Sequence, residues 1–322
     1  MFYYNRRLIR TVGFVGLGKS NEGVLRYLMK HYKYLEFILR SSSTVGYDEA
    51  IFKKCYFGAD SYNDIREDIL FLSPSVRRDI PELIRAEDSG VIISSDAELF
   101  FDGIKNDVYA VSGSDGKSTT TYLTSRLLCS AYKEVYPCGN IGEAMSPHLD
   151  DSVGVAEVTE LSSFQLSYME PKANRAVITN ITENHLNWHK SFNEYIGAKK
   201  NIFFRASDRV VNFDCSVTRR IAKDFDIFAV FSKMLSEEYL KSKIAAKLYI
   251  TLSDGVITAS GEPMLDVKKI KVGGEYNILN FMAAIAMSYG KCTKVDILRL
   301  AESFGGLPHR RELVCESDGV RY

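Results

Sequence analysis

Short hydrophobic runs alternate with amphipathic stretches over residues 12–100. "TVGFVG" precedes the helical pattern "SNEGVLRYLMKHY". The runs "LEFILR" and "DILFLSP" are followed by the helix-like "RDIPELIRAEDSG" and the strand-like "VIIS". Strands that alternate with helices predict βαβ units on a parallel sheet. We therefore expect a Rossmann-like α/β domain over residues 1–103.

A second series of the same kind starts at "DVYAVSG" and continues through "KSTTTYLTSRLL", "VGVAEV", "RAVITN" and "DRVVNF". It predicts a central α/β domain of the P-loop ATPase type, with a mainly parallel sheet, over residues 104–307. "KLYITLSDGVITAS" predicts a β-hairpin that turns at Asp254-Gly255, and "EYNILNFMAAIAMSYG" predicts a helix closed by Gly290.

The last residues, 308–322, contain "RRELVCESDGVRY", which predicts a second hairpin that turns at Asp318-Gly319. Its return strand has barely begun at Tyr322, and natural domains seldom end inside a strand whose edge stays unpaired. We interpret this segment as the start of a truncated C-terminal domain, most of which is missing from the chain.

The charge balance narrows the classes of ligand. The 322 residues include 41 Lys plus Arg and 41 Asp plus Glu, so no overall positive field attracts nucleic acid or an acidic membrane. The six cysteines show no C-x-x-C spacing, which argues against a zinc site or a disulfide framework and fits a reducing cytoplasm. No apolar stretch reaches membrane-spanning length. A polyanionic ligand would have to be held by local groups.

The stretch "VSGSDGKSTTT" ends like a phosphate-binding loop, but Val111 stands where G-x-x-x-x-G-K-[ST] requires glycine. The apolar "VYAV" before it predicts a strand, and "KSTTTYLTSRLL" predicts a helix whose N-terminus would face phosphates. Lys117 would neutralise the β- and γ-phosphates, and Ser118 would bind magnesium. Gly113 and Gly116 stand where a side chain would most obstruct the ligand.

Two later segments supply further polar residues. "EVTELSSFQLSYM" places Glu160 after a buried strand, where a carboxylate could hold magnesium, although Ser162 or Ser163 could also simply cap a helix there. "NITENHLNWH" follows the strand-like "RAVIT", and His185 within it is a candidate metal or substrate contact. His189 is assigned to the surface. The other polar residues of this segment are Asn180, Asn184 and Asn187.

Taken in order, these segments resemble the ATP-dependent Mur ligases of peptidoglycan synthesis. The resemblance rests on "SGSDGKSTT", "CGNIGEAM", "ELSSFQL", "NITENHLNWH", "YIGAKKNIF", "YNILNFMAAIA" and "GLPHRRELV", which cover most of the chain. "ELSSFQL" with "GNIG" favours the branch that joins D-glutamate to UDP-N-acetylmuramoyl-L-alanine. Family members read T-G-T/S-N-G-K-[ST] at the loop and also lack the first glycine. Asp115 replaces their usual Asn and puts an acid beside the phosphates.

The resemblance implies an ATP site with two magnesium ions. Ser118 and Glu160 would bind one ion, and His185 and Lys199 would bind the second. Lys199 matches the family lysine that becomes carbamylated, and a carbamate is an anion that can coordinate a hard cation. Catalysis would depend on Lys117, Glu160, His185 and Lys199. The residues implied to contact ATP are Gly113, Ser114, Asp115, Gly116, Lys117, Ser118, Thr119, Asn277, Asn280, His309 and Arg310.

The resemblance also gives the N-terminal domain a ligand. "GFVGLGKSNEGVLRYL" departs from the dinucleotide fingerprint G-x-G-x-x-G, because the glycine that follows Gly16 and Gly18 comes only at Gly23. The resemblance assigns this turn to the UDP diphosphate instead. The implied contacts of the UDP substrate are Gly16, Leu17, Gly18, Lys19, Ser20, Asn21, Arg40, Ser41, Asn140 and Ser162.

The implied activity is ATP-dependent amide-bond formation through an acyl phosphate, by a cytoplasmic monomer with no nucleic-acid or membrane partner. A truncated chain would turn over poorly or not at all. Three alternatives remain. A folylpolyglutamate synthetase-like ligase would need a pterin site in place of the UDP cradle. In an inert nucleotide-binding protein, mutation of Lys117 would change ATP binding but no reaction. An NAD-dependent oxidoreductase built on Gly16 and Gly18 would leave the second series unexplained.

Overall fold

The computed structural model describes residues 1–42, 48–307, 316–317 and 320–321. These form two compact units, Met1–Lys105 with Cys138–Asp151, and Asn106–Pro137 with Ser152–Tyr322. The hydrophobic pattern places the boundary after residue 103 and all of 104–307 in one domain. In the structure the first unit extends to Lys105 and also includes Cys138–Asp151.

The sheet of the first unit is parallel and has the order β5-β4-β3-β6-β7. Its strands are β3 (Thr11–Val15), β4 (Glu36–Ser41), β5 (Lys54–Phe57), β6 (Ile69–Leu72) and β7 (Ile92–Ser94). A short hairpin, β1 (Tyr3–Tyr4) with β2 (Arg7–Leu8), precedes them. The central strands β3 and β6 are apolar on both faces because helices cover both faces.

Helices α1 (Lys19–His31) and α3 (Asp96–Gly103) cover one face of this sheet, where Leu28 and Leu99 pack with Phe14. Helix α2 (Pro81–Asp88) covers the other face, where Leu83 packs with Leu70. The predicted alternation of strands and helices over residues 12–100 is therefore confirmed, except that it revealed neither β5 nor α3.

The sheet of the second unit has the order β16-β15-β14-β13-β12-β11-β8-β10-β9. Strands β10, β8, β11, β12, β13 and β14 run parallel to one another, and β15 and β16 are antiparallel. Their bounds are β8 (Asp107–Ser112), β9 (Glu134–Gly139), β10 (Val155–Glu160), β11 (Ala173–Ile178), β12 (Ala206–Asn212), β13 (Ile227–Ser232), β14 (Ala246–Ser253), β15 (Val256–Ala259) and β16 (Glu262–Asp266).

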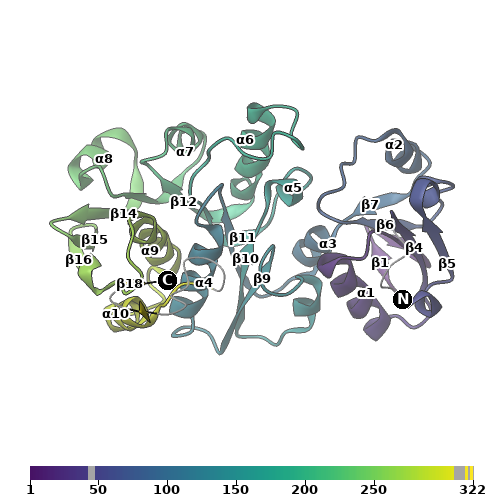
Figure 1. Ribbon diagram of the computed structural model, residues 1–322, viewed down its shortest axis with the longest axis horizontal. Coiled ribbons are helices and arrows are strands. Elements are labelled where there is room, and N and C mark those ends of the chain that lie inside the picture. The colour runs from purple at the N-terminus through teal and green to yellow at the C-terminus, as the bar shows by residue number, and fades with distance from the viewer. Residues whose placement is uncertain (43–47, 308–315, 318–319, 322) are drawn as a thin grey trace. The chain divides into compact units, whose positions relative to one another are not determined.

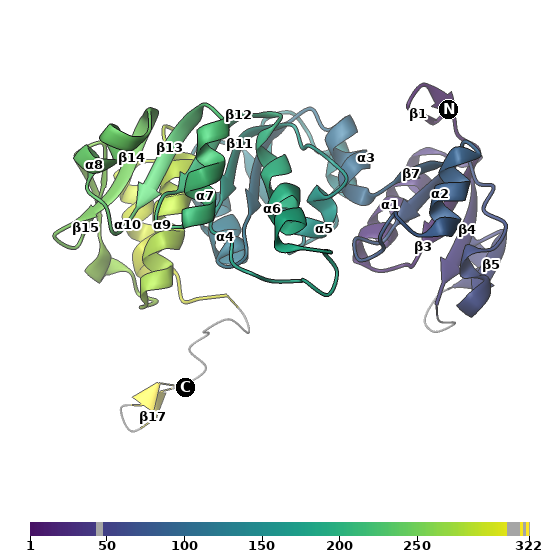
Figure 2. The ribbon, with the colours of Figure 1, turned by 90° about the horizontal axis from the view of Figure 1, so that it is seen from above.

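Helices cover both faces of this sheet (Figures 1 and 2). Apolar side chains of α4 (Lys117–Leu128), α9 (Glu275–Ser288) and α10 (Lys294–Ser303) form one core with the sheet. On the opposite side, Figure 1 shows α6 (Phe192–Lys200), α7 (Ser216–Ile221) and α8 (Glu237–Lys243). The short α5 (Ser163–Leu166) follows β10. This arrangement confirms the predicted α/β class with a mainly parallel sheet.

The strand register determines where the site lies. Val111 on β8 pairs with Glu160 on β10 and with Val177 on β11. The carboxyl ends of these three strands therefore meet at one edge, and the loop after Ser112 lies beside the segment after Ile178. Open α/β sheets commonly bind ligands outside this edge.

Several local predictions are also confirmed. Strands β14 and β15 form the hairpin at Asp254-Gly255, and both turn residues have positive φ. Helix α9 is followed by Gly290 with φ +80°. At the C-terminus, β17 (Glu316–Ser317) pairs antiparallel with β18 (Val320–Arg321), while the rest of 308–322 lies outside the described residues. Within the described part of the chain, no helix is long and apolar enough to cross a membrane.

Candidate active site

The phosphate-binding loop connects β8 to α4 as the sequence predicts, with the strand ending at Ser112 and the helix starting at Lys117. Gly116 precedes the helix in the left-handed conformation, with φ +77°. The N-terminal turn of α4 contains Ser118, which is buried, and Thr119. The first N–H groups of a helix lack intrahelical partners, so this turn can bind an anion.

The loop is held by the segment that follows β11. The N–H of Asp115 donates to Oδ1 of Asn180 at 2.9 Å, and the amide nitrogen of Asn180 donates to the carbonyl of Asp115 at 3.0 Å. The hydroxyl of Thr179 donates to the same carbonyl at 2.6 Å. Asn180, one of the polar residues that follow the strand in the sequence, therefore fixes the loop through its side chain.

Two glycines of the loop have neighbours too close for a side chain. A Cβ on Gly113 would lie 1.9 Å from Oγ1 of Thr179, and one on Gly116 would lie 2.3 Å from Oδ1 of Asn280. Both have positive φ, which L-residues adopt at a cost. Val111, which stands where the motif would have its first glycine, lies within β8 and is fully buried.

Lys199 is almost fully buried, at 1% exposure, and its Nζ donates to the carbonyl of Gly113 at 2.7 Å. Its Nζ also lies 4.7 Å from the ring centre of Tyr195, whose hydroxyl is 2.9 Å from Oγ of Ser114. Tyr195 was missed in the sequence. Its spacing of four residues from Lys199 places both on one face of α6, which was the available signal.

The four predicted catalytic residues lie in one electrostatic neighbourhood. Burial lowers the pKa of Lys199 well below its usual range, Lys117 lowers it further, and Glu160 and Asp115 oppose this. Burial also lowers the pKa of His185, and the positive charges of Lys199 and Lys117 add to the effect. His185 is therefore neutral at neutral pH and can act as a ligand or an acceptor.

A cavity of about 510 Å³ adjoins the phosphate loop. Its wall includes Asn277 and Asn280 on α9, together with the mostly exposed Tyr276. The Asn277 amide donates to the carbonyls of Val272 and Gly273, and the Asn280 amide donates to Oδ1 of Asn277. The structure thus brings both predicted asparagines next to the loop, although their amides already support the cavity wall.

The sequence predicts His189 at the surface, but this prediction is wrong, because the residue is only 1% exposed. Its Nε2 lies 2.9 Å from the Ser163 hydroxyl, and its Nδ1 lies 3.6 Å from Glu194. Its hydrogen-bond partner Ser163 is 26 residues away in sequence, so no local pattern indicated that this polar ring would be buried.

In the first unit, the turn from β3 to α1 has the form of an anion cradle. Gly16 has φ +72°, Gly18 precedes α1 and is exposed, and Ser20 lies in its first turn. Lys19 donates to the carbonyl of Gly142 at 2.9 Å. Asn21 is fully buried, and its amide donates to the carbonyls of Val15, Gly16 and Phe71. Asn21 therefore shapes the turn from inside.

Arg40 has a structural role that the sequence did not indicate. Its guanidinium pairs with both carboxylate oxygens of Glu67 and donates to the carbonyls of Ser61, Asn63 and Asp64. These bonds use all five of its N–H donors. Arg40 is only 1% exposed, so its predicted place in the UDP site stays a prediction, in which it would support the wall of that site.

The remaining predicted contacts are scattered. Ser41 ends β4 and is buried, Leu17 is buried in the first core, and Asn140 is exposed. Ser162 caps α5 in a capping box with Gln165, which is the structural alternative considered for this segment. His309 and Arg310 lie outside the described residues.

The donor set fits magnesium. Ser118 and Glu160 are buried and offer oxygen ligands, and Glu160 lies near Lys117 and Lys199 in one cluster. Among the described residues, no three His, Cys, Asp or Glu side chains converge as a metal site of their own. Magnesium is commonly held by one or two carboxylates, with phosphates and water as the other ligands. A phosphate bound at this loop would lie beside Ser118 and could supply such ligands.

Comparisons with known proteins agree with this geometry. Residues 111–288 match the family model described as the Mur ligase middle domain. The UDP-N-acetylmuramoylalanine--D-glutamate ligase of Clostridium botulinum strain Hall is 32% identical over 97% of this chain and 69% of that protein. The enzyme of the same name from Acetivibrio thermocellus is 37% identical over 79% of this chain and 55% of that protein.

Solved structures show the same fold. The UDP-N-acetylmuramate-alanine ligase of Thermotoga maritima has a TM-score of 0.57 at 21% identity, over 97% of this chain and 72% of that chain. The UDP-N-acetylmuramate:L-alanyl-gamma-D-glutamyl-meso-diaminopimelate ligase of Neisseria meningitides has a TM-score of 0.61 at 13% identity, over 93% of this chain and 99% of that chain.

Proposed function

Because this chain belongs to the Mur ligase family of ATP-dependent amide-bond ligases, we propose that it joins D-glutamate to the free carboxylate of UDP-N-acetylmuramoyl-L-alanine. The observation that carries the proposal is the convergence of Lys117, Glu160, His185 and Lys199 beside a phosphate loop in which Gly113 and Gly116 leave no room for a side chain. The names of the curated relatives support D-glutamate as the amino acid. We further propose that the chain acts as a cytoplasmic monomer in peptidoglycan synthesis.

In the proposed reaction, the carboxylate attacks the γ-phosphorus of ATP, which releases ADP and gives an acyl phosphate. The amine of D-glutamate then forms the C–N bond, the amine loses a proton, and the C–O bond to phosphate breaks. The loop N–H groups around Gly113 and Gly116 bind the triphosphate, and Lys117 neutralises part of its charge. The cavity beside Asn277 and Asn280 takes the adenine.

For the metal, we propose that Ser118 and Glu160 hold one magnesium ion and that His185 and Lys199 hold a second. When bound, magnesium offsets the charge that develops on the transferring phosphoryl group. Lys199 would serve as its carbamate, formed when the uncharged amine bonds to the carbon of CO₂ and loses a proton. Burial and the charge of Lys117, which lower the pKa of Lys199, favour the uncharged amine.

For the muramoyl substrate, we propose that the first unit binds the UDP group. The turn formed by Gly16, Leu17, Gly18 and Lys19 would bind the diphosphate at the N-terminus of α1. Ser41 would lie near the uridine at the end of the adjacent strand β4. Asn21 and Arg40 would shape this site from inside, since the protein already occupies their donors.

The test is release of ADP and phosphate with ATP, Mg²⁺, UDP-N-acetylmuramoyl-L-alanine and D-glutamate. We expect turnover only when all four are present, no replacement of D-glutamate by L-glutamate, and loss of turnover in Lys117→Met. Equal turnover with L-glutamate would refute the amino-acid assignment. Failure of UDP to compete with the muramoyl substrate would favour a folylpolyglutamate synthetase-like ligase instead.

A further inference from the structure

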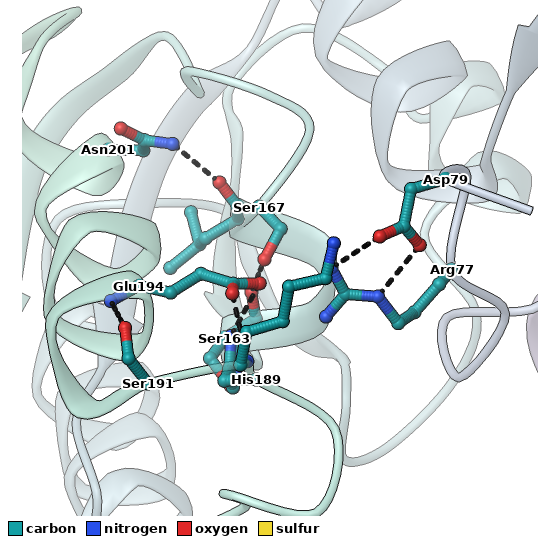
Figure 3. Close-up of polar contacts among 10 residues, drawn as sticks. Arg77, Asp79, Ser163, Ser167, His189, Ser191, Glu194 and Asn201 are labelled. Carbon is teal, nitrogen blue, oxygen red and sulfur yellow. Dashed lines mark hydrogen bonds and ion pairs between the residues drawn. The ribbon is translucent and has the colours of Figure 1, made fainter.

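His189 lies buried at the junction of three segments of the second unit (Figure 3). Its Nε2 is 2.9 Å from the hydroxyl of Ser163, the first residue of α5, which follows Glu160 closely in sequence. Its Nδ1 is 3.6 Å from Oε1 of Glu194, near the start of α6, the helix that carries Lys199. One imidazole therefore contacts two segments that carry predicted metal ligands.

The third segment is the turn that contains His189 itself. The backbone N–H of His189 donates to the carbonyl of His185 at 3.0 Å, and this hydrogen bond closes the turn that carries His185. The ring packs against Phe164, Trp188 and Tyr195, with ring centres 5.9, 4.6 and 5.2 Å away. The imidazole cannot rotate without moving these rings.

The partners also define the tautomer. A carboxylate facing Nδ1 favours the proton on that nitrogen, so Nε2 accepts the hydrogen bond that the Ser163 hydroxyl donates. Glu194 is itself fixed, because its Oε2 accepts from the N–H of Lys190 at 2.9 Å and its own N–H donates to Oγ of Ser191 at 3.1 Å. Ser163, His189 and Glu194 thus form a polar chain, with a hydrogen bond between Ser163 and His189 and an ion-pair contact of 3.6 Å between His189 and Glu194.

We propose that the polar chain of Ser163, His189 and Glu194 is a positioning device. It fixes the segments that carry Glu160, His185 and Lys199 relative to one another, and so sets their affinity for a divalent cation. The inference rests on the proposed function in assigning the metal to these residues. The order Ser–His–Glu is also that of a hydrolase triad, but Ser163 is only 2% exposed, which leaves no approach for a substrate.

The experiment is a Mn²⁺ titration followed by the EPR signal of free Mn²⁺, in the presence of the non-hydrolysable analogue AMP-PNP. In His189→Leu the dissociation constant for Mn²⁺ should rise about 10-fold, the effect typical for loss of a partner that orients ligands. His189→Gln keeps an acceptor for Ser163 and should recover most of the affinity. Ser163→Ala should weaken Mn²⁺ binding as well, whereas the matched Ser167→Ala should not, because the Ser167 hydroxyl donates to a backbone carbonyl, that of Ser163, within the described part of the chain.

The affinity for AMP-PNP in EDTA should be the same in all variants. Unchanged Mn²⁺ binding in folded His189→Leu, or equal losses in Ser163→Ala and Ser167→Ala, would overturn the inference. If His189→Leu does not fold, the variants Ser163→Ala and Glu194→Gln test the same polar chain at its other two residues. A wild-type protein that shows the expected Mn²⁺ pattern but does not use D-glutamate would refute the proposed substrate and still support the positioning role.

Discussion

Gly116 determines whether the phosphate loop can close against α9. In Gly116→Ala, the new Cβ would lie 2.3 Å from Oδ1 of Asn280, and the residue would have to keep φ +77°. The left-handed conformation alone costs about 1–2 kcal/mol for a non-glycine residue. We expect Gly116→Ala to lose most ATP affinity, measured by calorimetry, and to unfold at a lower temperature.

Gly197→Ala is the matched control, because a Cβ there meets no atom within 4 Å and the residue is an exposed part of α6. It should be neutral or stabilise the protein by up to about 1 kcal/mol, since alanine is the better helix former. If Gly116→Ala bound ATP like Gly197→Ala, the described loop conformation would not be the one that binds nucleotide.

Asp115 places a carboxylate in the wall of the cavity beside the phosphate loop, where we propose that ATP binds. Asp115→Asn should tighten ATP binding, because it removes one negative charge near the phosphates, by about 1 kcal/mol at low salt. The gain should shrink as salt is added, since the carboxylate is exposed. Isothermal titrations at low and high salt measure this effect. An unchanged affinity at low salt would show that the carboxylate points away from the bound phosphates.

The sequence predicts individual residues well where a motif defines the chemistry. Lys117 and Gly113 lie where the loop pattern places them, because a strand, a glycine turn and a helix in direct succession leave little freedom. His189 and Arg40 could not be assigned in this way. Their hydrogen-bond partners, Ser163 and Glu67, are 26 and 27 residues away, so only the tertiary fold shows why these polar side chains are buried.

At the scale of elements, patterns identified most of the long strands and helices but missed short or irregular ones. "GVAEV" and "RAVIT" read as strands because most of their residues are apolar and buried on both faces of the sheet. Strand β5 has the sequence Lys-Cys-Tyr-Phe, without a buried residue, and β16 contains a proline. Such edge strands carry a weak pattern, since one side of each has no partner strand.

The pairing of β3 with β6 depends on a carboxylate at the start of β6. Asp68 accepts from the N–H groups of Arg10 and Thr11 at 2.8 and 2.9 Å. Burial would raise the pKa of Asp68, but these hydrogen bonds outweigh it and lower the pKa below 3.8. A lowered folded pKa means that ionised Asp68 stabilises the fold fully above the unfolded value, and that this contribution disappears as pH falls through the folded value.

Asp68→Asn should therefore lower the urea midpoint of the first unit at pH 7, and the difference from wild type should narrow at pH values below 3.8. Equilibrium urea unfolding over this pH range measures both effects. The exposed Asp88, at the end of α2, provides the matched control Asp88→Asn, for which we expect no such narrowing. A constant difference between wild type and Asp68→Asn across the acid range would contradict the assignment.

At the scale of the whole molecule, the two units interleave in sequence. The chain leaves the second unit after Pro137, contributes Cys138–Asp151 to the first, and returns at Ser152. Hydrophobic patterns could not predict this, because the segment has no long apolar run. Besides the hydrogen bond from Lys19 to Gly142, the segment is held by a buried side chain of the first unit, Asp96 at the start of α3. Asp96 accepts from the N–H groups of Met145 and Ser146 and from the Ser146 hydroxyl.

This attachment gives a test of whether the units are stable independently. Asp96→Ala leaves three buried donors without an acceptor, at a cost of about 1–3 kcal/mol for each unsatisfied group. Hydrogen exchange should accelerate across Cys138–Asp151 and α1, while β8 and α4 stay protected and the ATP affinity stays unchanged, since the described residues that we predict to contact ATP belong to the second unit. Asp102→Ala, an exposed position on the same helix, should leave both units protected. Loss of protection in α4 together with α1 would show instead that the two units unfold as one cooperative structure.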